Sequence, residues 1–283
     1  MATGQTTLWD RFLGSMLDPL LDREAMKRQF ERIDWQMEAD RFRRPGWVYP
    51  EYYRSQNFHG IEGGYLNAGA AVSYDPITQY VLPPNEGWVR EGVIEAVRSQ
   101  PRRILDLGCG TGSTTLLLKR RFPEAKVVGL DLSPYMLVMA RHKATGEGLQ
   151  IDWRQGMAED TGLEENSFDL ISLSLLFHET PPAVSQEILR ECFRLLRVGG
   201  EVVVLDGNQA SLRQTPWLME VFEEPYIAEY AQEDVGDWMR QAGFATVETR
   251  THWWIHQVTR GVKPIPGQEW IEEESVSEGM VFA

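Results

Sequence analysis

The chain has 283 residues, and its 42% hydrophobic and 25% charged residues are typical of a globular protein rather than a disordered one. The formal net charge of −14 argues against a nucleic acid partner, because phosphate binding needs clustered lysine and arginine, and it gives no support for binding to an anionic membrane surface. Cys109 lies in a glycine-rich loop and Cys192 in an expected helix, so neither a disulfide framework nor a zinc site is indicated. No apolar run has the length of a membrane span and the chain does not open on a signal peptide, so we expect a cytoplasmic protein.

Residues 1–85 are expected to form an N-terminal cap. Up to about residue 45, apolar side chains recur every three or four residues, which predicts helices. Such a face is usually core or dimer surface, and it would allow a homodimer through the N-terminal helices. Residues 47–85 are rich in aromatic residues and glycine, a composition that suits either the lid or wall of a substrate pocket or an irregular packing segment.

Residues 86–260 alternate between short apolar runs and helical patterns. A helix is predicted from Glu86 to Gln100, and two later helices begin at Ser133-Pro134 and at Pro182. Strands separated by helices at this spacing predict an α/β fold with a Rossmann-like, doubly wound, mostly parallel sheet of seven strands and an antiparallel last strand. The expected strands are 103–107, 126–132, 149–154, 168–175, 201–206, 244–250 and 253–258.

Two segments interrupt or follow this alternation. Residues 207–232 carry a helical pattern divided by Pro216 and Pro225, and we expect them to form a roof over a substrate. Residues 261–283 hold glutamates among proline and glycine and are expected to be a mobile acidic tail.

The stretch from Arg103 to Ser113 combines a strand, a glycine loop and the start of a helix. Gly108, Gly110 and Gly112 form G-x-G-x-G, which lets a ligand approach bare backbone N–H groups at a helix N-terminus. The dinucleotide fingerprint G-x-G-x-x-G would need glycine at position 113, where this chain has serine. Asp106 would end the strand with its carboxylate beside the loop, where it would repel a pyrophosphate and suit a ligand with a cationic amine or sulfonium.

This D-x-G-x-G-x-G arrangement resembles motif I of the class I S-adenosylmethionine-dependent methyltransferases, and the resemblance extends over roughly residues 86–258. Asp131 ends the second strand, where a carboxylate can accept both ribose hydroxyls of a nucleoside. NAD-binding proteins use the same device, so Asp131 alone does not discriminate. Together with Asp106 and the glycine spacing, it favours S-adenosylmethionine as the cofactor.

Later motifs agree with the resemblance. Gln155 to Asp160 is similar to the loop with which the family holds adenine, although Met157 stands where an aspartate is usual. Met157 would pack on the ring while the backbone N–H of Ala158 reads its edge. The segments 166–171 and 195–200 are similar to those that precede the family's fourth and fifth strands. The cofactor residues implied are Asp106, Gly108, Cys109, Gly110, Asp131, Leu132, Met136, Met157, Ala158, Glu159, the backbone near Leu173, and Tyr74 from a cap motif.

Methyl transfer needs little chemistry from a protein, because the sulfonium already activates the carbon and in-line positioning supplies much of the rate. A hydroxyl acceptor with a high pKa also benefits from a base. His178 follows the fourth strand at the edge of the sheet where ligands bind, so it is the candidate base or orienting group; the alternative is a capping or wall residue. The candidates for substrate contact, each of which could equally be a wall or core residue, are Tyr52, Tyr53, His59, Tyr65, Glu179, Tyr226 and His252.

We interpret the sequence as a methyltransferase that moves the methyl group of S-adenosylmethionine to a small-molecule acceptor by in-line displacement. The many aromatic candidates favour an aromatic or apolar acceptor, and no metal site is expected. Two alternatives stay open. A catalytically silent S-adenosylmethionine-binding protein would have the same binding residues, and an NAD(P)-dependent oxidoreductase would have to place a pyrophosphate beside Asp106.

Overall fold

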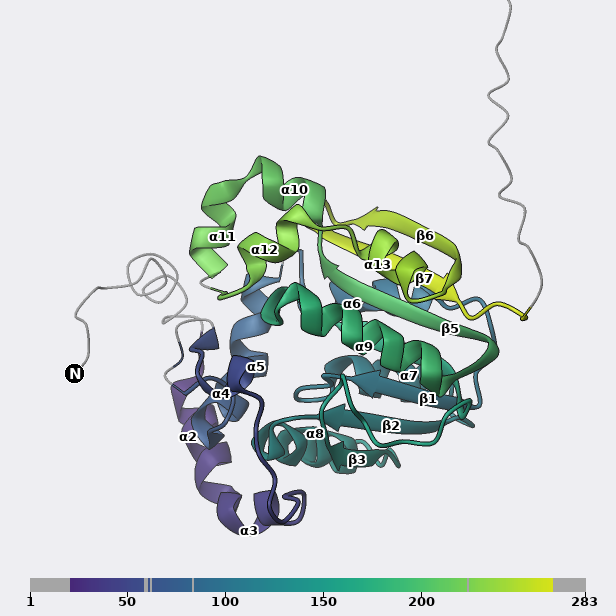
Figure 1. Ribbon diagram of the computed structural model, residues 1–283. Helices are drawn as coiled ribbons and strands as arrows, with labels where there is room; N and C mark the ends of the chain where they lie inside the picture. Colours follow the sequence, from purple (N-terminus) through teal and green to yellow (C-terminus); the bar gives the residue numbers. More distant parts are fainter. Residues whose placement is uncertain (1–20, 59–60, 62, 83, 223, 267–283) are drawn as a thin grey trace, which may run out of the picture.

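A seven-stranded sheet forms the centre of the protein (Figure 1). The computed structural model describes residues 21–58, 61, 63–82, 84–222 and 224–266. In the order β3-β2-β1-β4-β5-β7-β6, the first five strands run parallel, and β7 is antiparallel to both of its neighbours. The predicted fold class is thereby confirmed. The strands are β1 (Arg103–Leu107), β2 (Lys126–Asp131), β3 (Asp152–Gln155), β4 (Phe168–Ser174), β5 (Leu196–Gly207), β6 (Ala245–His252) and β7 (His256–Val262).

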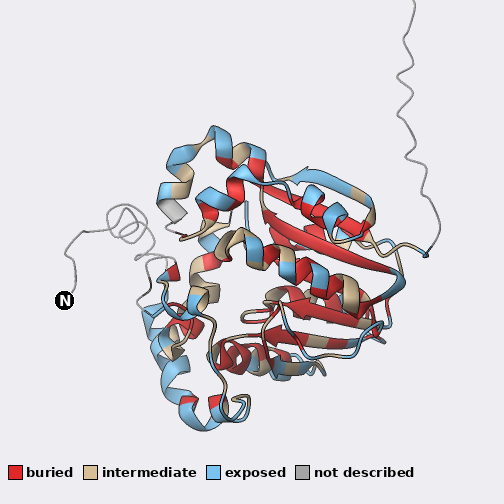
Figure 2. Cartoon of the chain, viewed as in Figure 1, coloured by how far each residue is buried: buried red, intermediate tan, exposed pale blue. Residues whose placement is uncertain are grey.

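Helices cover both faces of the sheet, and successive strand residues alternate between two cores. Ile104 packs with α6 (Glu86–Ala96) and α7 (Ser113–Arg121), whereas Leu105 packs with α9 (Pro182–Leu195) and α13 (Val235–Gln241). Because both faces are covered, the inner strands β1, β4 and β7 are buried along nearly their whole length, as the red arrows in Figure 2 show, whereas the edge strands β3 and β6 are largely unburied. The carboxyl ends of the parallel strands therefore meet at one protected edge.

The N-terminal part is more helical than the sequence indicated. It contains α2 (Arg23–Arg32), α3 (Trp35–Asp40), α4 (Glu51–Arg54) and α5 (Ala68–Val81), and α8 (Pro134–Gly146) packs against α3 and α5. Of the two alternatives for residues 47–85, an irregular packing segment does not describe α5, which is a regular helix. Pro76 removes one hydrogen bond inside that helix, but the Asn67 side chain caps it and Ala70 and Ala71 are buried, so packing overrides weak propensity. Residues 1–20, the first part of the expected helical face, lie outside the described residues.

The segment after β5 forms three short helices, α10 (Gln209–Gln214), α11 (Pro216–Phe222) and α12 (Ile227–Gln232), as its pattern indicated. The hairpin turn lies later than expected, because Trp253 and Trp254 adopt positive φ between β6 and β7. β7 reaches Val262, so the first residues of the expected tail belong to the sheet, and residues 267–283 lie outside the described residues. Within the described ranges, no helix is long and apolar enough to cross a bilayer.

Candidate cofactor and acceptor site

The glycine loop between β1 and α7 adopts a conformation that side chains disfavour. Gly108, Gly110 and Gly112 have φ values of 63°, 52° and 81°. A Cβ atom on Gly108 would lie 2.8 Å from Leu176 Cδ1, whereas one on Gly110 would meet nothing within 4 Å. The loop thus presses against the turn after β4 and leaves open space above Gly110.

Asp131 connects this loop to α8. Its Oδ2 accepts a 2.8 Å hydrogen bond from the Gly110 N–H, and its Oδ1 accepts one of 2.8 Å from Ser133 N–H. Burial raises the pKa of Asp131 to about 6, although the two backbone donors oppose that shift. Each carboxylate oxygen can still accept a further bond, so Asp131 can receive hydroxyl groups of a ligand.

A cavity opens over the loop at the carboxyl edge of the sheet, and we call it the loop cavity. Nine of the residues proposed for cofactor binding line it, so the structure brings them together. They are Tyr74, Gly108, Cys109, Gly110, Asp131, Leu132, Met136, Ala158 and Glu159.

Three residues proposed for the cofactor do not line the loop cavity. Asp106 points into the protein, where its carboxylate accepts hydrogen bonds from Thr115 Oγ1 at 2.5 Å and Ser172 Oγ at 2.6 Å. The expectation of a free carboxylate beside the loop is therefore corrected: through these hydrogen bonds Asp106 of β1 links this strand to α7 and β4. Leu173 is buried in the core, and the next two residues, Ser174 and Leu175, line the cavity instead. Gly156 and Ala158 line the cavity, but Met157 between them does not.

Arg90 of α6 lines the same cavity, and sequence reasoning missed it. Its Nε donates to Glu86 Oε1 at 2.8 Å and its Nη1 to Thr114 Oγ1 at 3.0 Å. Burial alone would lower the pKa of Arg90, but the Glu86 carboxylate holds it above its ordinary value. The feature of the sequence that could have indicated Arg90 is its position next to Val89, on the side of α6 that is expected to face the sheet.

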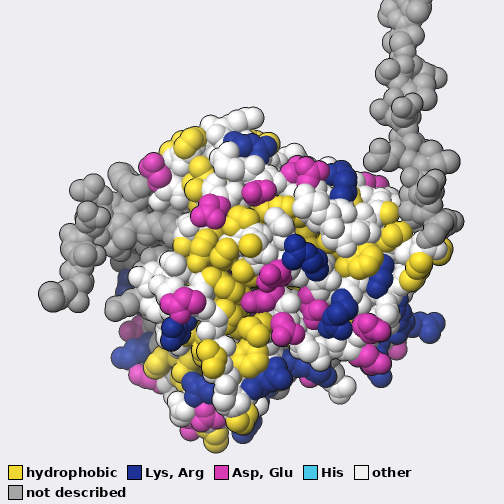
Figure 3. Space-filling model, in the orientation of Figure 1, with side chains coloured by type: hydrophobic (Ala, Val, Ile, Leu, Met, Phe, Trp, Pro, Cys, Tyr) yellow, Lys and Arg dark blue, Asp and Glu magenta, His cyan; other side chains and the backbone are white. Residues whose placement is uncertain are grey.

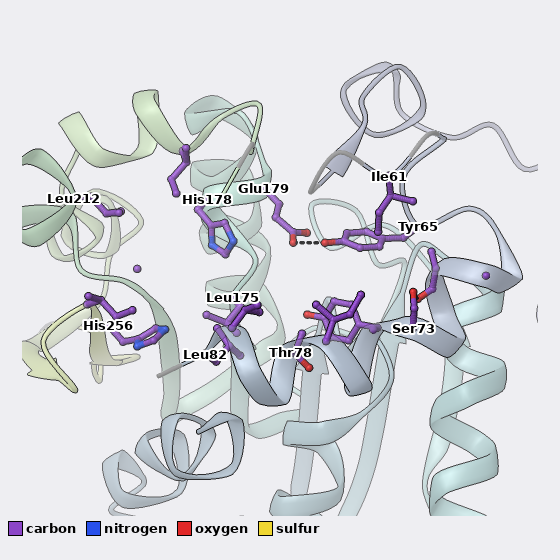
Figure 4. Close-up of a pocket in the computed structure, with 18 of the residues that line it drawn as sticks. Ile61, Tyr65, Ser73, Thr78, Leu82, Leu175, His178, Glu179, Leu212 and His256 are labelled. Atoms are coloured by element: carbon purple, nitrogen blue, oxygen red, sulfur yellow. Dashed lines mark hydrogen bonds between the residues drawn. The ribbon is translucent and has the colours of Figure 1, made fainter. Parts of the chain in front are cut away.

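A second cavity of about 330 Å³ adjoins the loop cavity, and we call it the apolar cavity (Figure 4). The two cavities share Tyr65, Tyr74, Leu175 and Glu179 as a common wall. These four residues therefore mark the boundary at which the two cavities meet. Apolar side chains in or next to α5, α10, α12 and the β6–β7 hairpin supply much of the remaining lining, namely Ile77, Val81, Leu82, Leu212, Ile227 and Ile255.

His178, which follows β4 and lines the apolar cavity, forms a buried pair with Asp206 near the end of β5. His178 Nδ1 lies 2.5 Å from Asp206 Oδ1, and Asp206 also accepts the backbone N–H groups of three residues, Leu176, Phe177 and Gly207. Burial would lower the pKa of His178, but Asp206 raises it to about 10, with smaller effects from Glu179 and Glu224. His178 is thus a cation at neutral pH, and its Nε2 is the nitrogen left to donate a hydrogen bond.

The residues proposed for substrate contact divide into groups. Tyr65 and Glu179 line the apolar cavity, and the Tyr65 hydroxyl donates to Glu179 Oε1 at 2.8 Å (Figure 4). Tyr52 and Tyr53 line the loop cavity instead. Tyr226 and His252 line neither cavity: Tyr226 donates to the Tyr52 carbonyl, and the His252 ring contacts the carbonyls of Trp88 and Val89. His59 lies outside the described residues.

The free energy of unfolding should depend on pH through His178. Its pKa rises from 6.5 to about 10 on folding, so the stabilisation is complete below about pH 6.5 and is lost as the pH rises through about 10. Its size is on the order of 5 kcal/mol. We expect the difference in unfolding free energy between wild type and His178→Gln, measured in urea, to shrink over that range. A difference that does not change with pH would contradict a protonated His178.

The described residues contain no group of three or more His, Cys, Asp or Glu side chains placed to hold a metal ion. On the face shown in Figure 3, acidic and basic side chains are mixed around a hydrophobic band. Neither observation changes the assignment of the two cavities as the candidate site.

Comparisons with known proteins agree with this geometry. A family model described as a methyltransferase domain matches residues 104–200. A demethylmenaquinone methyltransferase of Thermus thermophilus is 39% identical over 119 residues, which span 42% of this chain and 53%, about half, of that relative. An uncharacterized methyltransferase of Synechocystis is 34% identical over 157 residues, which span 53% of this chain and 69% of that relative. The solved structure titled PigF with SAH has a TM-score of 0.55 at 23% identity, covers 70% of this chain and 61% of its own, and supports the fold.

Proposed function

This chain belongs to the class I S-adenosylmethionine-dependent methyltransferases, and we propose that it transfers the methyl group of S-adenosylmethionine to a small apolar acceptor. The observation that carries the proposal is the wall shared by the two cavities. Tyr65, Tyr74, Leu175 and Glu179 face both, so a ligand in the loop cavity and an acceptor in the apolar cavity would meet there.

The loop cavity has the polar groups that S-adenosylmethionine requires. Asp131 offers carboxylate oxygens to the ribose hydroxyls, and the open space above Gly110 admits the ligand close to the backbone. Arg90 is a buried cation in the same lining and suits the carboxylate of the methionine end. Gly156 and Ala158 also line this cavity, and we propose that the adenine lies beside them.

Transfer then depends on how the protein's own residues orient the acceptor. When bound, the cofactor supplies an electrophilic methyl carbon on its sulfonium. The acceptor is proposed to enter as its phenolate, with its proton released to solvent beforehand; the apolar lining then excludes water, and His178 donates its remaining N–H to the phenolate oxygen and stabilises the negative charge there. Because His178 is already protonated at neutral pH, we assign it an orienting and electrostatic role rather than that of a base.

The acceptor class follows from the cavity and from the relatives. The lining is mostly apolar, and a relative is named a demethylmenaquinone methyltransferase. We therefore propose an aromatic acceptor with an ionisable hydroxyl. Lining residues from α5, α10 and α12 support the proposed roles of residues 1–85 as a cap and 207–232 as a roof.

Titration calorimetry and a turnover assay test this function. We expect S-adenosylmethionine to bind with a dissociation constant of roughly 1 μM to 1 mM, and NADH to give no heat. Radiolabelled S-adenosylmethionine should then label apolar phenols in a panel of metabolites. Binding of NADH in place of S-adenosylmethionine would favour the oxidoreductase, and binding of S-adenosylmethionine with no labelled product would favour the silent binding protein.

Three attributes inferred from the sequence belong to the same proposal. We propose a cytoplasmic enzyme with no nucleic acid partner, consistent with the net charge of −14, and a homodimer formed through the N-terminal helices. Phe30 of α2 and Met37 of α3 are partly exposed apolar side chains on those helices. Light scattering of the purified full chain measures the dimer directly, and a monomer at micromolar concentration would contradict it.

A further inference from the structure

His256 is a buried polar side chain that the proposed reaction leaves without a role. It begins β7, is 3% exposed and lines the apolar cavity. Neither ring nitrogen has a hydrogen-bond partner among the described residues, and Nδ1 is fully buried. Burial lowers the pKa of His256 to about 4, and the nearby cations His178 and Arg90 act in the same direction, against Asp206. The ring is therefore neutral at physiological pH.

A neutral imidazole without a partner is costly in this position. Its fully buried Nδ1 has lost its hydrogen bond to water and has gained none from the protein. Nε2 also has no partner among the described residues, but it is not fully buried, so it is the ring nitrogen that a ligand in the apolar cavity can meet. Buried polar side chains in native proteins nearly always have partners, and a ligand bound to Nε2 would supply one.

The position of His256 indicates which part of a ligand it would meet. It lines the apolar cavity alone and is absent from the wall shared with the loop cavity. Figure 4 shows its ring turned toward the middle of the cavity, across from Tyr65 and Glu179. The same cavity is also lined by aliphatic side chains, Leu82 and Leu175 among them.

We propose that His256 is a specificity residue that hydrogen-bonds an oxygen of the acceptor at the end remote from the methylated atom. The acceptor is then an apolar molecule with oxygen atoms at two separated positions. One oxygen binds near the shared wall, and the other is hydrogen-bonded by His256. This inference rests on the proposed methyl transfer but concerns only the choice of acceptor. The neutral His256 ring can donate or accept a hydrogen bond, depending on its tautomer, and a hydroxyl group on the acceptor can pair with either tautomer.

A matched pair of probes tests the inference: 1-naphthol, with one hydroxyl, and naphthalene-1,4-diol, with a second on the far side, kept anaerobic. Calorimetry measures their binding to protein saturated with S-adenosylhomocysteine. We expect wild type to prefer the diol by at least about tenfold, and His256→Leu to lose that preference while its affinity for 1-naphthol is unchanged. His256→Gln, which retains a donor and an acceptor, should recover part of it. His252→Leu changes a histidine of the same hairpin outside both cavities and should keep the full preference.

Thermal denaturation of the unliganded variants separates recognition from a structural role. Leucine removes an unpaired polar group, so His256→Leu should keep or raise the melting temperature while it loses selectivity. A His256→Leu protein that is less stable than wild type, or that still prefers the diol, would overturn the inference. Failure to bind S-adenosylhomocysteine would instead count against the proposed function, since His256 does not line the loop cavity.

Discussion

Asp206→Asn is expected to lower the free energy of unfolding by about 3–5 kcal/mol and to remove most methyl transfer. The Asp206 carboxylate accepts one backbone N–H on Oδ1 and two on Oδ2, in addition to His178. An asparagine offers one oxygen and one NH₂ group, so in either orientation at least one backbone N–H faces another donor. The loss leaves buried donors unpaired and removes the anion that keeps His178 protonated. Urea denaturation and the turnover assay measure the two effects.

Asp237→Asn is the matched control for this change. Asp237 pairs with Arg240 on α13, and its side chain is 65% exposed, so solvent screens the pair. Such a surface pair contributes at most about 1 kcal/mol. If both asparagine variants unfold at the same denaturant concentration, the four-bond arrangement at Asp206 does not stabilise the protein.

The sheet could be predicted because its signals are local and strong. The inner parallel strands contain short apolar runs with turn residues at their ends, and burial on both faces produces this pattern, whereas the edge strand β3 is polar and largely unburied. The signal for α5 was weaker, because Gly69 and Pro76 reduce its helix propensity and the packing partners Met136 and Met139 lie on α8, far along the chain. Only the tertiary contact makes that segment a helix.

The cofactor cavity was more predictable than the acceptor cavity for a related reason. The glycine loop and Asp131 are fixed by backbone geometry at the ends of adjacent parallel strands, so their spacing in the sequence carries the information. The prediction of a free Asp106 carboxylate was wrong because the sequence does not show that the hydroxyls of Ser172 and Thr115 donate hydrogen bonds to it. Asp206 and His256 could not be identified, since they act through pairings of β5 with β4 and β7 that join distant residues.

Gly110→Val is expected to weaken S-adenosylmethionine binding by about a hundredfold or more with little loss of folded structure. A side chain at φ +52° costs about 1–2 kcal/mol in backbone strain. No protein atom lies within 4 Å of its Cβ, so the valine would meet no neighbour but would project from the loop-cavity lining where the cofactor is proposed to lie.

Gly146→Val controls for the loss of a glycine, because its Cβ also meets nothing within 4 Å and it ends α8 outside both cavities. Calorimetry with S-adenosylmethionine should detect binding to Gly146→Val and not to Gly110→Val, while circular dichroism shows both variants folded. Equal affinities would mean that the cofactor does not approach the backbone at Gly110. The proposed position of the cofactor at Asp131 would then also be wrong, because the Gly110 N–H donates the hydrogen bond that holds the Asp131 carboxylate at this loop.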